Sequence, residues 1–468
     1  MHALDRKQLL WLAGLLLLWS LYGLTGHDAW KPYEARVLGG LLDWQAQGAL
    51  FQEASPPLYS LAVSLVATFS GGALELQDAA RVATGLFSLL AFLCTGLAAR
   101  ALFGPGHEAA AVLSLMGCLG LMLRAHALLP ETATLLAYAL LLLALVEARE
   151  RALRGGLLLA AAFACLALLR GWADLAAGLV IVLATLLSWE WRRPPLLRAL
   201  LLGLALSGLL LAGLSWQAAG QGSGWLGMSG AFLVRPRHPG SVLEDLSWIA
   251  WPVWPLALWS IWYDARRLRR EFVLHPLLLA VVILYAWAHV QAYSREGGLV
   301  ALLVPLSLLA ARALPSLKRG AAQAMYWFGV LTFSFFAIAF WFYYLALDWG
   351  WPVRAAAHLA RLTPQYTPGA IGPAAWFVAG AATLLWLVAI PLFPRAKVRP
   401  VLVWATGMTV TWVTLYSLFH AWGDAGWGYR ATLRDMVRHL PAQACLRVAG
   451  QDDVAAMARY YLPERYRA

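Results

Sequence analysis

The chain has 468 residues, of which 61% are hydrophobic and 13% charged, and its mean hydropathy is +0.66. This composition excludes an ordinary soluble protein and a disordered one, because apolar stretches of membrane-spanning length follow one another almost from end to end. The net charge of +12 does not indicate a nucleic-acid partner, since the basic residues stand in short clusters between the apolar stretches.

These basic clusters indicate how the chain crosses the membrane. They are Arg149, Arg151 and Arg154; Arg192, Arg193 and Arg198; Arg266, Arg267, Arg269 and Arg270; Lys318 and Arg319; and Arg395, Lys397 and Arg399. Alternate loops lack such clusters, which is the positive-inside pattern of polytopic membrane proteins. The first apolar stretch, roughly 9–24, follows two basic residues and has no A-x-A cleavage site after it. We therefore expect an uncleaved span with a cytoplasmic N-terminus.

Hydropathy predicts about thirteen transmembrane helices, each long enough for the hydrocarbon core. They cover approximately 8–25, 79–102, 108–125, 132–148, 156–170, 172–189, 198–215, 247–263, 274–292, 298–313, 325–346, 372–393 and 400–420. With the N-terminus in the cytoplasm, every Arg-rich loop then falls on the cytoplasmic side.

The longer polar segments are expected outside the cytoplasm. The first, 26–78, separates the first two spans, and its part 57–70 is apolar but short, which predicts a helix at the outer interface. Two further outer loops are expected at about 216–246 and 347–371.

The polar tail predicts a small outer subdomain over 421–468, beside a transmembrane domain over 1–420. Its expected elements are a helix near 431–440, a strand at Cys445–Ala449 and a helix near 452–461. Because this α/β tail is too short to bury a core of its own, we expect it to pack on the membrane domain.

Neither the cysteines nor the histidines have the spacing of a metal centre or a disulfide framework. Cys94, Cys118 and Cys165 fall inside apolar spans, and Cys445 stands alone near the C-terminus. The histidines on or near outer segments are His27, His126, His238 and His358. We predict no metal ligands, and a divalent cation stays open as a cofactor only through a mixed site at His27 and Asp28.

A charged segment follows the first span: His27-Asp28-Ala29-Trp30-Lys31-Pro32-Tyr33-Glu34-Ala35-Arg36. Carboxylates at the edge of a bilayer are costly to desolvate, so a cluster of them indicates a functional site. The alternative is helix capping, since Pro32 and Glu34 also suit the first turn of a juxtamembrane helix. For Asp28 both interpretations stay open.

Here the sequence resembles a known family. Asp-x-Trp-x-Pro-x-Glu-x-Arg, then Pro56-Pro57-Leu58-Tyr59, then Ala79-Ala80-Arg81 resemble the aminoarabinose transferase/protein O-mannosyltransferase superfamily. Further matches in the same order are Arg124 to Glu131, Leu169-Arg170-Gly171, and Arg295 before Leu303-Val304-Pro305. The likeness covers roughly 1–315. The chain departs from the family pattern in having Tyr33 where an Asp is common, Ser55 where a Lys is common and Arg170 for Lys.

Sugar transfer from a lipid phosphate needs a carboxylate that removes a proton from the acceptor hydroxyl, and cations that stabilise the departing phosphate. We predict Glu34 as the catalytic carboxylate, with Asp28 and Glu131 as helpers. The predicted donor-phosphate ligands are Lys31, Arg124, Arg170 and Arg295. Further site candidates are Arg36, Tyr33, Ser55 and Tyr59. Interfacial snorkelling is the alternative role for each of the cations.

The resemblance implies an all-α polytopic membrane protein with a GT-C-like helix bundle. It implies an inverting glycosyltransferase in the inner (cytoplasmic) membrane, with its active site on the extracytoplasmic (periplasmic) face. The expected partners are a polyprenyl-phosphate-linked sugar donor, a lipid, glycan or protein acceptor such as lipid A, and membrane lipids, with no nucleic acid.

Two other functions stay open. A transporter or flippase for a lipid-linked or anionic substrate is disfavoured, because we find no convincing internal repeat and the charges gather on one side of the membrane. A non-catalytic homologue is the second alternative, because Tyr33 replaces the usual carboxylate.

Overall fold

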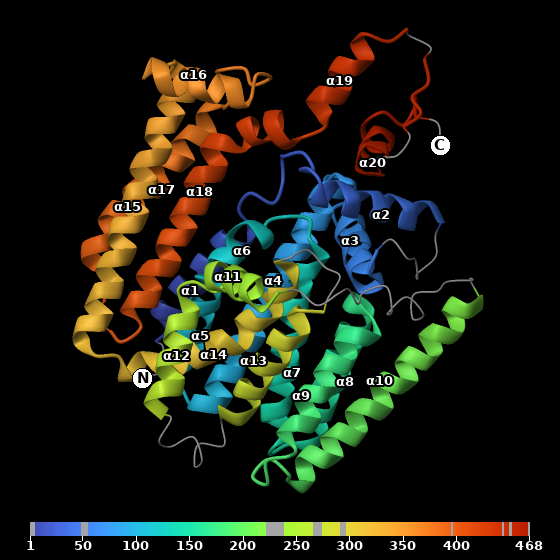
Figure 1. The fold of residues 1–468 in the computed structure, drawn as a ribbon, viewed down its shortest axis with the longest axis vertical. Coiled ribbons are helices and arrows are strands. Elements are labelled where there is room, and N and C mark those ends of the chain that lie inside the picture. Colours follow the sequence, from blue (N-terminus) through green and yellow to red (C-terminus); the bar gives the residue numbers. More distant parts are fainter. Residues whose placement is uncertain are drawn as a thin grey trace.

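The computed structural model describes residues 5–47, 55–220, 238–264, 274–290, 296–394, 396–441, 444–448 and 452–466. These residues are mostly helical, as predicted (Figure 1). The strand expected at Cys445–Ala449 is wrong for the described part of the tail, which has only an isolated β-bridge between Leu446 and Tyr466. A single bridge is no strand, because a strand needs a ladder of successive pairs.

The first half of the chain contains α1 (Arg6–Leu21), α2 (Tyr33–Gln47), α3 (Pro57–Phe69), α4 (Leu76–Phe103), α5 (His107–Met116), α6 (Leu119–Arg124), α7 (Pro130–Ala148), α8 (Ala152–Arg170), α9 (Trp172–Thr185) and α10 (Pro194–Gly220). The second half contains α11 (Pro239–Ile249), α12 (Val253–Asp264), α13 (His275–Ala288), η3 (Gly297–Leu302), α14 (Leu303–Ala313), η4 (Leu314–Ser316), α15 (Arg319–Trp349), α16 (Val353–Leu362), α17 (Pro373–Leu392), α18 (Arg399–Trp427), α19 (Arg430–Arg438) and α20 (Asp452–Tyr461).

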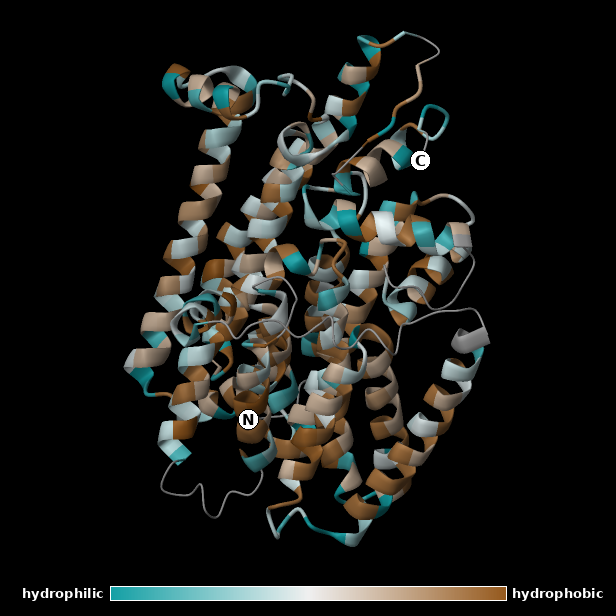
Figure 2. Cartoon of the chain, turned by 45° about the vertical axis from the view of Figure 1, so that its right-hand side comes forward, coloured by the Kyte–Doolittle hydropathy of each residue, from teal (hydrophilic) through white to brown (hydrophobic). Residues whose placement is uncertain are grey.

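Among the described residues, eight helices are long and apolar enough to cross a membrane: Leu76–Phe103, Pro130–Ala148, Ala152–Arg170, Pro194–Gln217, Gly297–Ser316, Arg319–Trp349, Pro373–Leu392 and Arg399–Trp427. All eight coincide with predicted spans. The five other predicted spans fall on shorter helices. The spans 8–25, 172–189 and 274–292 correspond to α1, α9 and α13. The span 108–125 is divided between α5 and α6, and 247–263 lies mainly on α12, with its first residues in α11. Figure 2 shows hydrophobic residues along the long helices and hydrophilic residues mainly at their ends.

The helix pairs α5/α6 and α11/α12 contact each other at the short breaks within each pair. The amide of Leu119, at the start of α6, donates to the carbonyl of Trp251 over 3.0 Å, and the indole of Trp404 donates to the carbonyl of Gly117 over 2.8 Å. Backbone groups freed within an apolar bundle must find such partners, because no water replaces them. A Cβ at Gly117 would lie 2.8 Å from Trp404, so the close approach needs a glycine.

The centre of the bundle is built by α4, α7, α8 and α14, whereas α15 and α17 lie at its edge together with α18 (Figure 1). In the most apolar part of the 297–316 span, 94% of the residues are buried, against 11% in the 373–392 span. The apolar residues of α17 therefore face away from the protein, as expected for a helix in contact with lipid.

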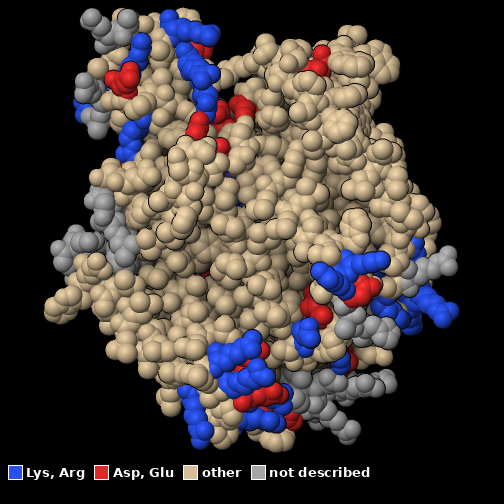
Figure 3. All heavy atoms as spheres, turned by 180° about the vertical axis from the view of Figure 1, so that it is seen from behind, with Lys and Arg blue, Asp and Glu red and all other residues tan. Residues whose placement is uncertain are grey.

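The basic loops gather at one end of the bundle. Arg312 pairs with Asp264 and lies over the ring of Phe103, and Arg149 lies over the ring of Trp191. The first loop, α2 and the tail lie at the opposite end, where α4 begins (Figure 1). Seen from behind, charged atoms gather toward both ends, with a broad uncharged band between them (Figure 3). This distribution agrees with the alternation of basic loops in the sequence.

Candidate functional site

The charged segment 27–36 surrounds a buried arginine from another helix, Arg81, in the second turn of α4. Its guanidinium donates to the carbonyl oxygens of His27 and Asp28 over 2.9 and 2.8 Å, and to the carboxylates of Glu34 and Asp78 over 3.2 and 3.0 Å. The Arg81 side chain is fully buried. A buried cation is tolerated only when its donors are satisfied, so Arg81 holds the loop before α2 in one conformation.

Glu34 fills its hydrogen-bonding capacity within the protein. One carboxylate oxygen accepts from Arg81 and from the amide of Leu128 over 2.6 Å; the other accepts from the amide of Trp30 over 2.8 Å and lies 3.4 Å from a second nitrogen of Arg81. Burial by itself raises the pKa of Glu34, but Arg81 and the hydrogen bonds outweigh burial and hold the pKa below its usual value. This geometry suits a carboxylate that fixes the conformation of a loop, and it disfavours protonation of Glu34.

Asp28 has different surroundings. Its amide donates to Asp424 Oδ1 of α18 over 3.0 Å, and its Oδ1 forms an ion pair with Arg430 Nε of α19 at 2.8 Å. Burial raises the pKa of Asp28 above its usual value, although Arg430 and the hydroxyl of Tyr461 oppose that rise. A carboxyl group with a raised pKa accepts a proton more readily than an ordinary aspartate, as a general base must.

The three other candidates of the segment lie around this pair. Lys31 is exposed, and its Nζ lies 5.0 Å from the centre of the Tyr429 ring, at the start of the tail. Tyr33 is 53% exposed, and Arg36 is exposed as well. Their side chains are accessible to a bound molecule, in contrast to Glu34.

Ser55 and Tyr59 serve packing in this conformation. The hydroxyl of Tyr59 donates to the carbonyl of Ala80 over 3.0 Å and lies 2.9 Å from that of Thr84, which attaches α3 to α4. The hydroxyl of Ser55 lies 2.7 Å from that of Ser60. Both side chains are buried, so neither reaches an open site.

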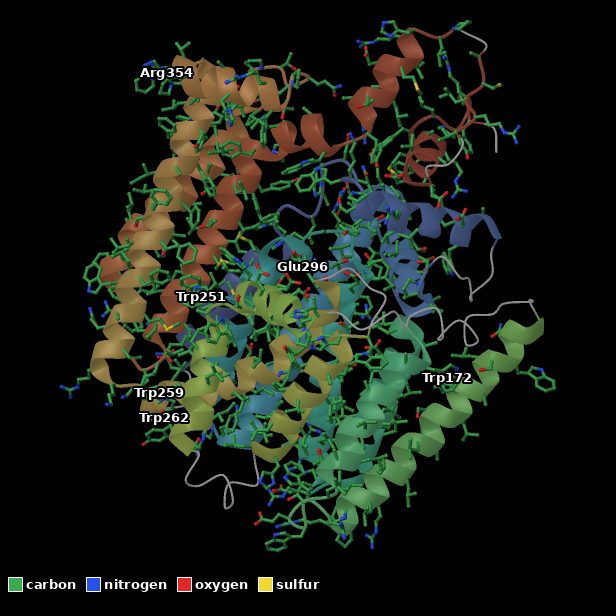
Figure 4. All side chains as sticks on the ribbon, viewed as in Figure 1. Trp172, Trp251, Trp259, Trp262, Glu296 and Arg354 are labelled. Carbon is green, nitrogen blue, oxygen red and sulfur yellow. The ribbon has the colours of Figure 1, made fainter. Side chains whose placement is uncertain are left out.

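A second charged cluster begins beside Glu34. Leu128, which donates to Glu34, lies in the loop between Arg124 and Glu131. Arg124 forms ion pairs with Glu131 at 3.3 Å and with Glu296. Glu296, labelled in Figure 4, is the most exposed of the three. The predicted phosphate ligand Arg295 lies outside the described residues, next to this cluster in the chain.

Arg170 lies in a different network. Its Nε is 3.4 Å from the carboxylate of Asp174, which also accepts from the hydroxyl of Tyr138 over 2.9 Å. Tyr138 and Glu131 are seven residues apart on α7, so the Arg170 and Arg124 networks are about 10 Å apart along that helix. Figure 4 agrees, with Trp172 nearer the opposite end of the bundle than Glu296. The predicted convergence of Arg124, Arg170 and Arg295 on one phosphate stays a prediction.

Sequence reasoning missed three residues of the site. Arg81 was only part of a motif, and the acidic and basic partners of Asp28, Asp424 and Arg430, follow the last predicted span. The available signal was charge: a carboxylate within the last turn of an apolar helix is as costly as those of the first loop. Nothing local indicates that it meets a residue 396 positions earlier.

The fold has counterparts among solved structures. The crystal structure of ArnT from Cupriavidus metallidurans bound to undecaprenyl phosphate matches with a TM-score of 0.70 and 16% identity, covering 99% of this chain and 86% of that chain. The apo state of ArnT matches with a TM-score of 0.66 and 16% identity, covering 97% and 84%. The chain has a GT-C fold. No family model and no curated protein matches the sequence.

The GT-C fold confirms the fold that the ordered motifs of the first 315 residues led us to expect. The structural likeness also extends beyond these motifs, because it covers 99% of the chain. It therefore includes α15–α18 and the tail, which bring Asp424 and Arg430 to the first loop.

Proposed function

We propose that the chain is a membrane glycosyltransferase that moves a sugar from a polyprenyl-phosphate donor to a lipid-linked or envelope acceptor. The observation that carries the proposal is the likeness of nearly the whole chain to ArnT, whose solved structure holds undecaprenyl phosphate. The charged residues around Asp28, at one end of an otherwise apolar bundle, support it further, because sugar transfer from a lipid needs acid–base groups next to the membrane.

Asp28 is the general base of this proposal, and Glu34 holds the loop that carries it. Asp28 takes the proton of the acceptor hydroxyl while the hydroxyl oxygen forms a bond to the anomeric carbon. The bond from that carbon to the phosphate oxygen breaks, and its electron pair leaves with the polyprenyl phosphate. Attack opposite to the leaving phosphate inverts the anomeric centre. The saturated carboxylate of Glu34 supports this division of roles, since its four neighbouring donors all favour the charged form.

The leaving phosphate needs cations. Lys31 belongs to the Asp28–Glu34 loop, and Arg124 shortly precedes Leu128, whose amide donates to Glu34. Arg295 adjoins Glu296 of the Arg124 cluster. Arg124 is now paired with two carboxylates, so phosphate binding would exchange one anionic partner for another. Glu131 acts here through Arg124. Arg170, the last residue of α8, belongs to the network of Tyr138, about 10 Å from Glu131 along α7, which suits contact with the lipid-linked side of the donor.

The proposal places the reaction on the extracytoplasmic face of the inner membrane. The basic loops at the opposite end of the bundle support this orientation, since such loops stay in the cytoplasm. Within the described ranges, no three His, Cys, Asp or Glu side chains come close enough to share a metal ion.

Mass spectrometry of envelope glycolipids, glycans and glycoproteins, with and without the gene, tests the function. We expect one glycan or lipid species to lose a single sugar in the deletion strain and to regain it with the wild-type gene. Purified protein in liposomes should then transfer that sugar from undecaprenyl-phosphate-sugar. Movement of the lipid across the liposome bilayer without sugar transfer would instead identify a flippase. Loss of a partner enzyme's product, with no transfer by the chain alone, would identify a non-catalytic homologue.

A further inference from the structure

Two charged residues of the C-terminal part of the chain contact the first loop at Asp28. Asp424 Oδ1, in the last turn of α18, accepts both the amide of Asp28 over 3.0 Å and the indole of Trp30 over 2.9 Å. Arg430 Nε, in the first turn of α19, lies 2.8 Å from Asp28 Oδ1. The backbone and the carboxylate of Asp28 are thus held by two different helices.

Arg430 is itself held in place by α20 and α4. Its guanidinium lies 4.8 Å from the centre of the Tyr461 ring and 3.4 Å from Glu75. The hydroxyl of Tyr461 donates to Gln77 Oε1, which also accepts from the amide of Ala29. The tail and the first loop therefore share one continuous set of polar contacts, and the Arg430 side chain, 31% exposed, keeps a fixed direction toward Asp28.

We propose that Asp424 and Arg430 are positioning residues of the transfer reaction, which fix the orientation and the charge of Asp28. This inference rests on the proposed function, in which Asp28 takes the acceptor proton. Neither residue touches the reacting atoms: Asp424 acts through the backbone amide of Asp28, and Arg430 acts through the Asp28 carboxylate.

The two residues act on Asp28 in different ways. Arg430 favours the ionised form of Asp28, which a base needs before it can accept a proton. Asp424 accepts from the amide of Asp28 and from the indole of Trp30, and so fixes the backbone of the loop. The other charged and titratable groups beside Asp28 are Arg81 from α4, Tyr461 from α20 and His27 from the first loop. Substituting Arg430 therefore changes the charge beside Asp28, and substituting Asp424 changes the anchor of its backbone.

The first test needs no substrate. Purified full-length protein in detergent is treated with a carbodiimide and glycinamide between pH 4.5 and 8, and modification of Asp28, which requires the protonated carboxyl, is measured by peptide mass spectrometry. Asp424→Asn keeps an acceptor for both hydrogen bonds and should leave the labelling midpoint near the wild-type value. Arg430→Gln should move it up by about one unit or more, and Arg430→Lys should restore most of the wild-type value.

The second test measures sugar transfer from undecaprenyl-phosphate-sugar. Asp424→Leu, which removes the acceptor of both hydrogen bonds, and Arg430→Gln should lower kcat about 10- to 100-fold, with KM for the donor nearly unchanged, because a misplaced base slows the chemical step alone. Asp424→Asn should keep kcat near the wild-type value, and the acid limb of kcat should move in the same directions as the labelling midpoints. Arg434→Gln is the matched control: it removes an exposed arginine of the same helix, α19, and should move neither limb nor midpoint.

The outcomes separate this inference from the proposed function. Sugar transfer with an unmoved midpoint in Arg430→Gln, with full turnover in Asp424→Leu, or with the same midpoint shift in the Arg434→Gln control overturns the inference and leaves the function standing. An Asp28 that resists labelling at every pH also overturns the inference. Midpoints that move as expected in a protein that transfers no sugar overturn the proposed function, while the charge control of Asp28 stands.

Discussion

Asp28 and Glu34 are carboxylates of one short loop, and their neighbours give them different properties. Glu34 has donors on both oxygens and a fully buried cation beside it. Asp28 pairs with a partly exposed arginine and lies next to a second carboxylate, Asp424. The first arrangement stabilises a permanent charge and the second one permits protonation, so the two acids are suited to fixing the loop and to proton transfer respectively.

Substituting Asp28 should therefore affect the reaction more than the fold. We expect Asp28→Asn to lower sugar-transfer turnover about 10²- to 10⁴-fold, because proton transfer to the base is lost. Its thermal stability should stay near that of the wild type, since an ion pair with a partly exposed arginine contributes little. Asp435→Asn, which removes an exposed carboxylate of α19, is the control and should keep full turnover. Full activity of Asp28→Asn would remove Asp28 from the mechanism.

Substituting Glu34 should affect the fold first. We expect Glu34→Gln to cost about 3–5 kcal/mol of unfolding free energy, because it leaves the buried Arg81 short of a negative partner. Denaturation of the purified variant beside Glu464→Gln, an exposed carboxylate of the tail, measures this loss. Unchanged stability together with abolished turnover would contradict our assignment and restore Glu34 as the catalytic base that the sequence motif predicts.

His27 makes the stability of the site depend on pH. Burial, and then the charge of Arg81, lowers the pKa of His27 to about 3 from the usual 6.5. The unfolded chain thus binds a proton below about pH 6.5 while the folded protein does not, so this stability is present above pH 6.5 and falls as pH decreases toward 3. His27→Asn should make the decline between pH 6.5 and 5 shallower by up to about 1.4 kcal/mol per pH unit. Equal slopes in thermal unfolding would show that His27 is protonated in the fold.

At the scale of elements, the tail is held mainly by α2. Helix α20 packs on α2, and Arg459 binds both the carboxylate of Asp43 and the carbonyl of Gly39. Gly39 allows this approach because any Cβ there would lie 2.7 Å from the Cβ of Ala456. The docking of α20 on α2 places Tyr461, and with it Arg430, beside the first loop.

A larger residue at Gly39 should separate α20 from α2. We expect Gly39→Val to make the tail sensitive to limited proteolysis and to lower turnover, because Arg430 loses its support. Gly380→Val serves as the control, since no atom lies within 4 Å of a Cβ at that position of α17. Protease resistance equal to wild type would mean that α19 holds the tail without α20.

At the scale of the whole molecule, the two ends of the bundle differ in chemistry. One end has the basic loops, and the other has the first loop, the Arg124 cluster and the tail. Cys445 is exposed in the tail, whereas Cys94 and Cys118 are buried within the bundle. The side of the membrane on which the tail lies can therefore be measured by labelling the native Cys445.

An impermeant maleimide added to intact cells, with the outer membrane permeabilised where there is one, should label Cys445, because the tail is expected on the extracytoplasmic side. Cys445→Ser should abolish that labelling. Lys318→Cys in the Cys445→Ser background should be labelled only after the inner membrane is opened, since Lys318 belongs to a basic loop. The reverse pattern would invert the topology and place the site in the cytoplasm.

The sequence by itself determined the membrane class, the eight long spans and the position of the first-loop acids. These properties are local, because hydropathy over about 20 residues decides whether a helix can cross a bilayer. Local reasoning also located α19 and α20 within one or two residues, but predicted a strand where the described residues have a single bridge.

Only the tertiary structure decided the different surroundings of Glu34 and Asp28. Glu34 meets Arg81 across 47 positions and Asp28 meets Asp424 across 396, and no pattern within a helix specifies such pairs. A carboxylate's basicity depends on the charges and donors within a few ångströms of it. Those neighbours are set by helix packing, so the folded bundle, rather than the motif, lowers the pKa of Glu34 and raises that of Asp28.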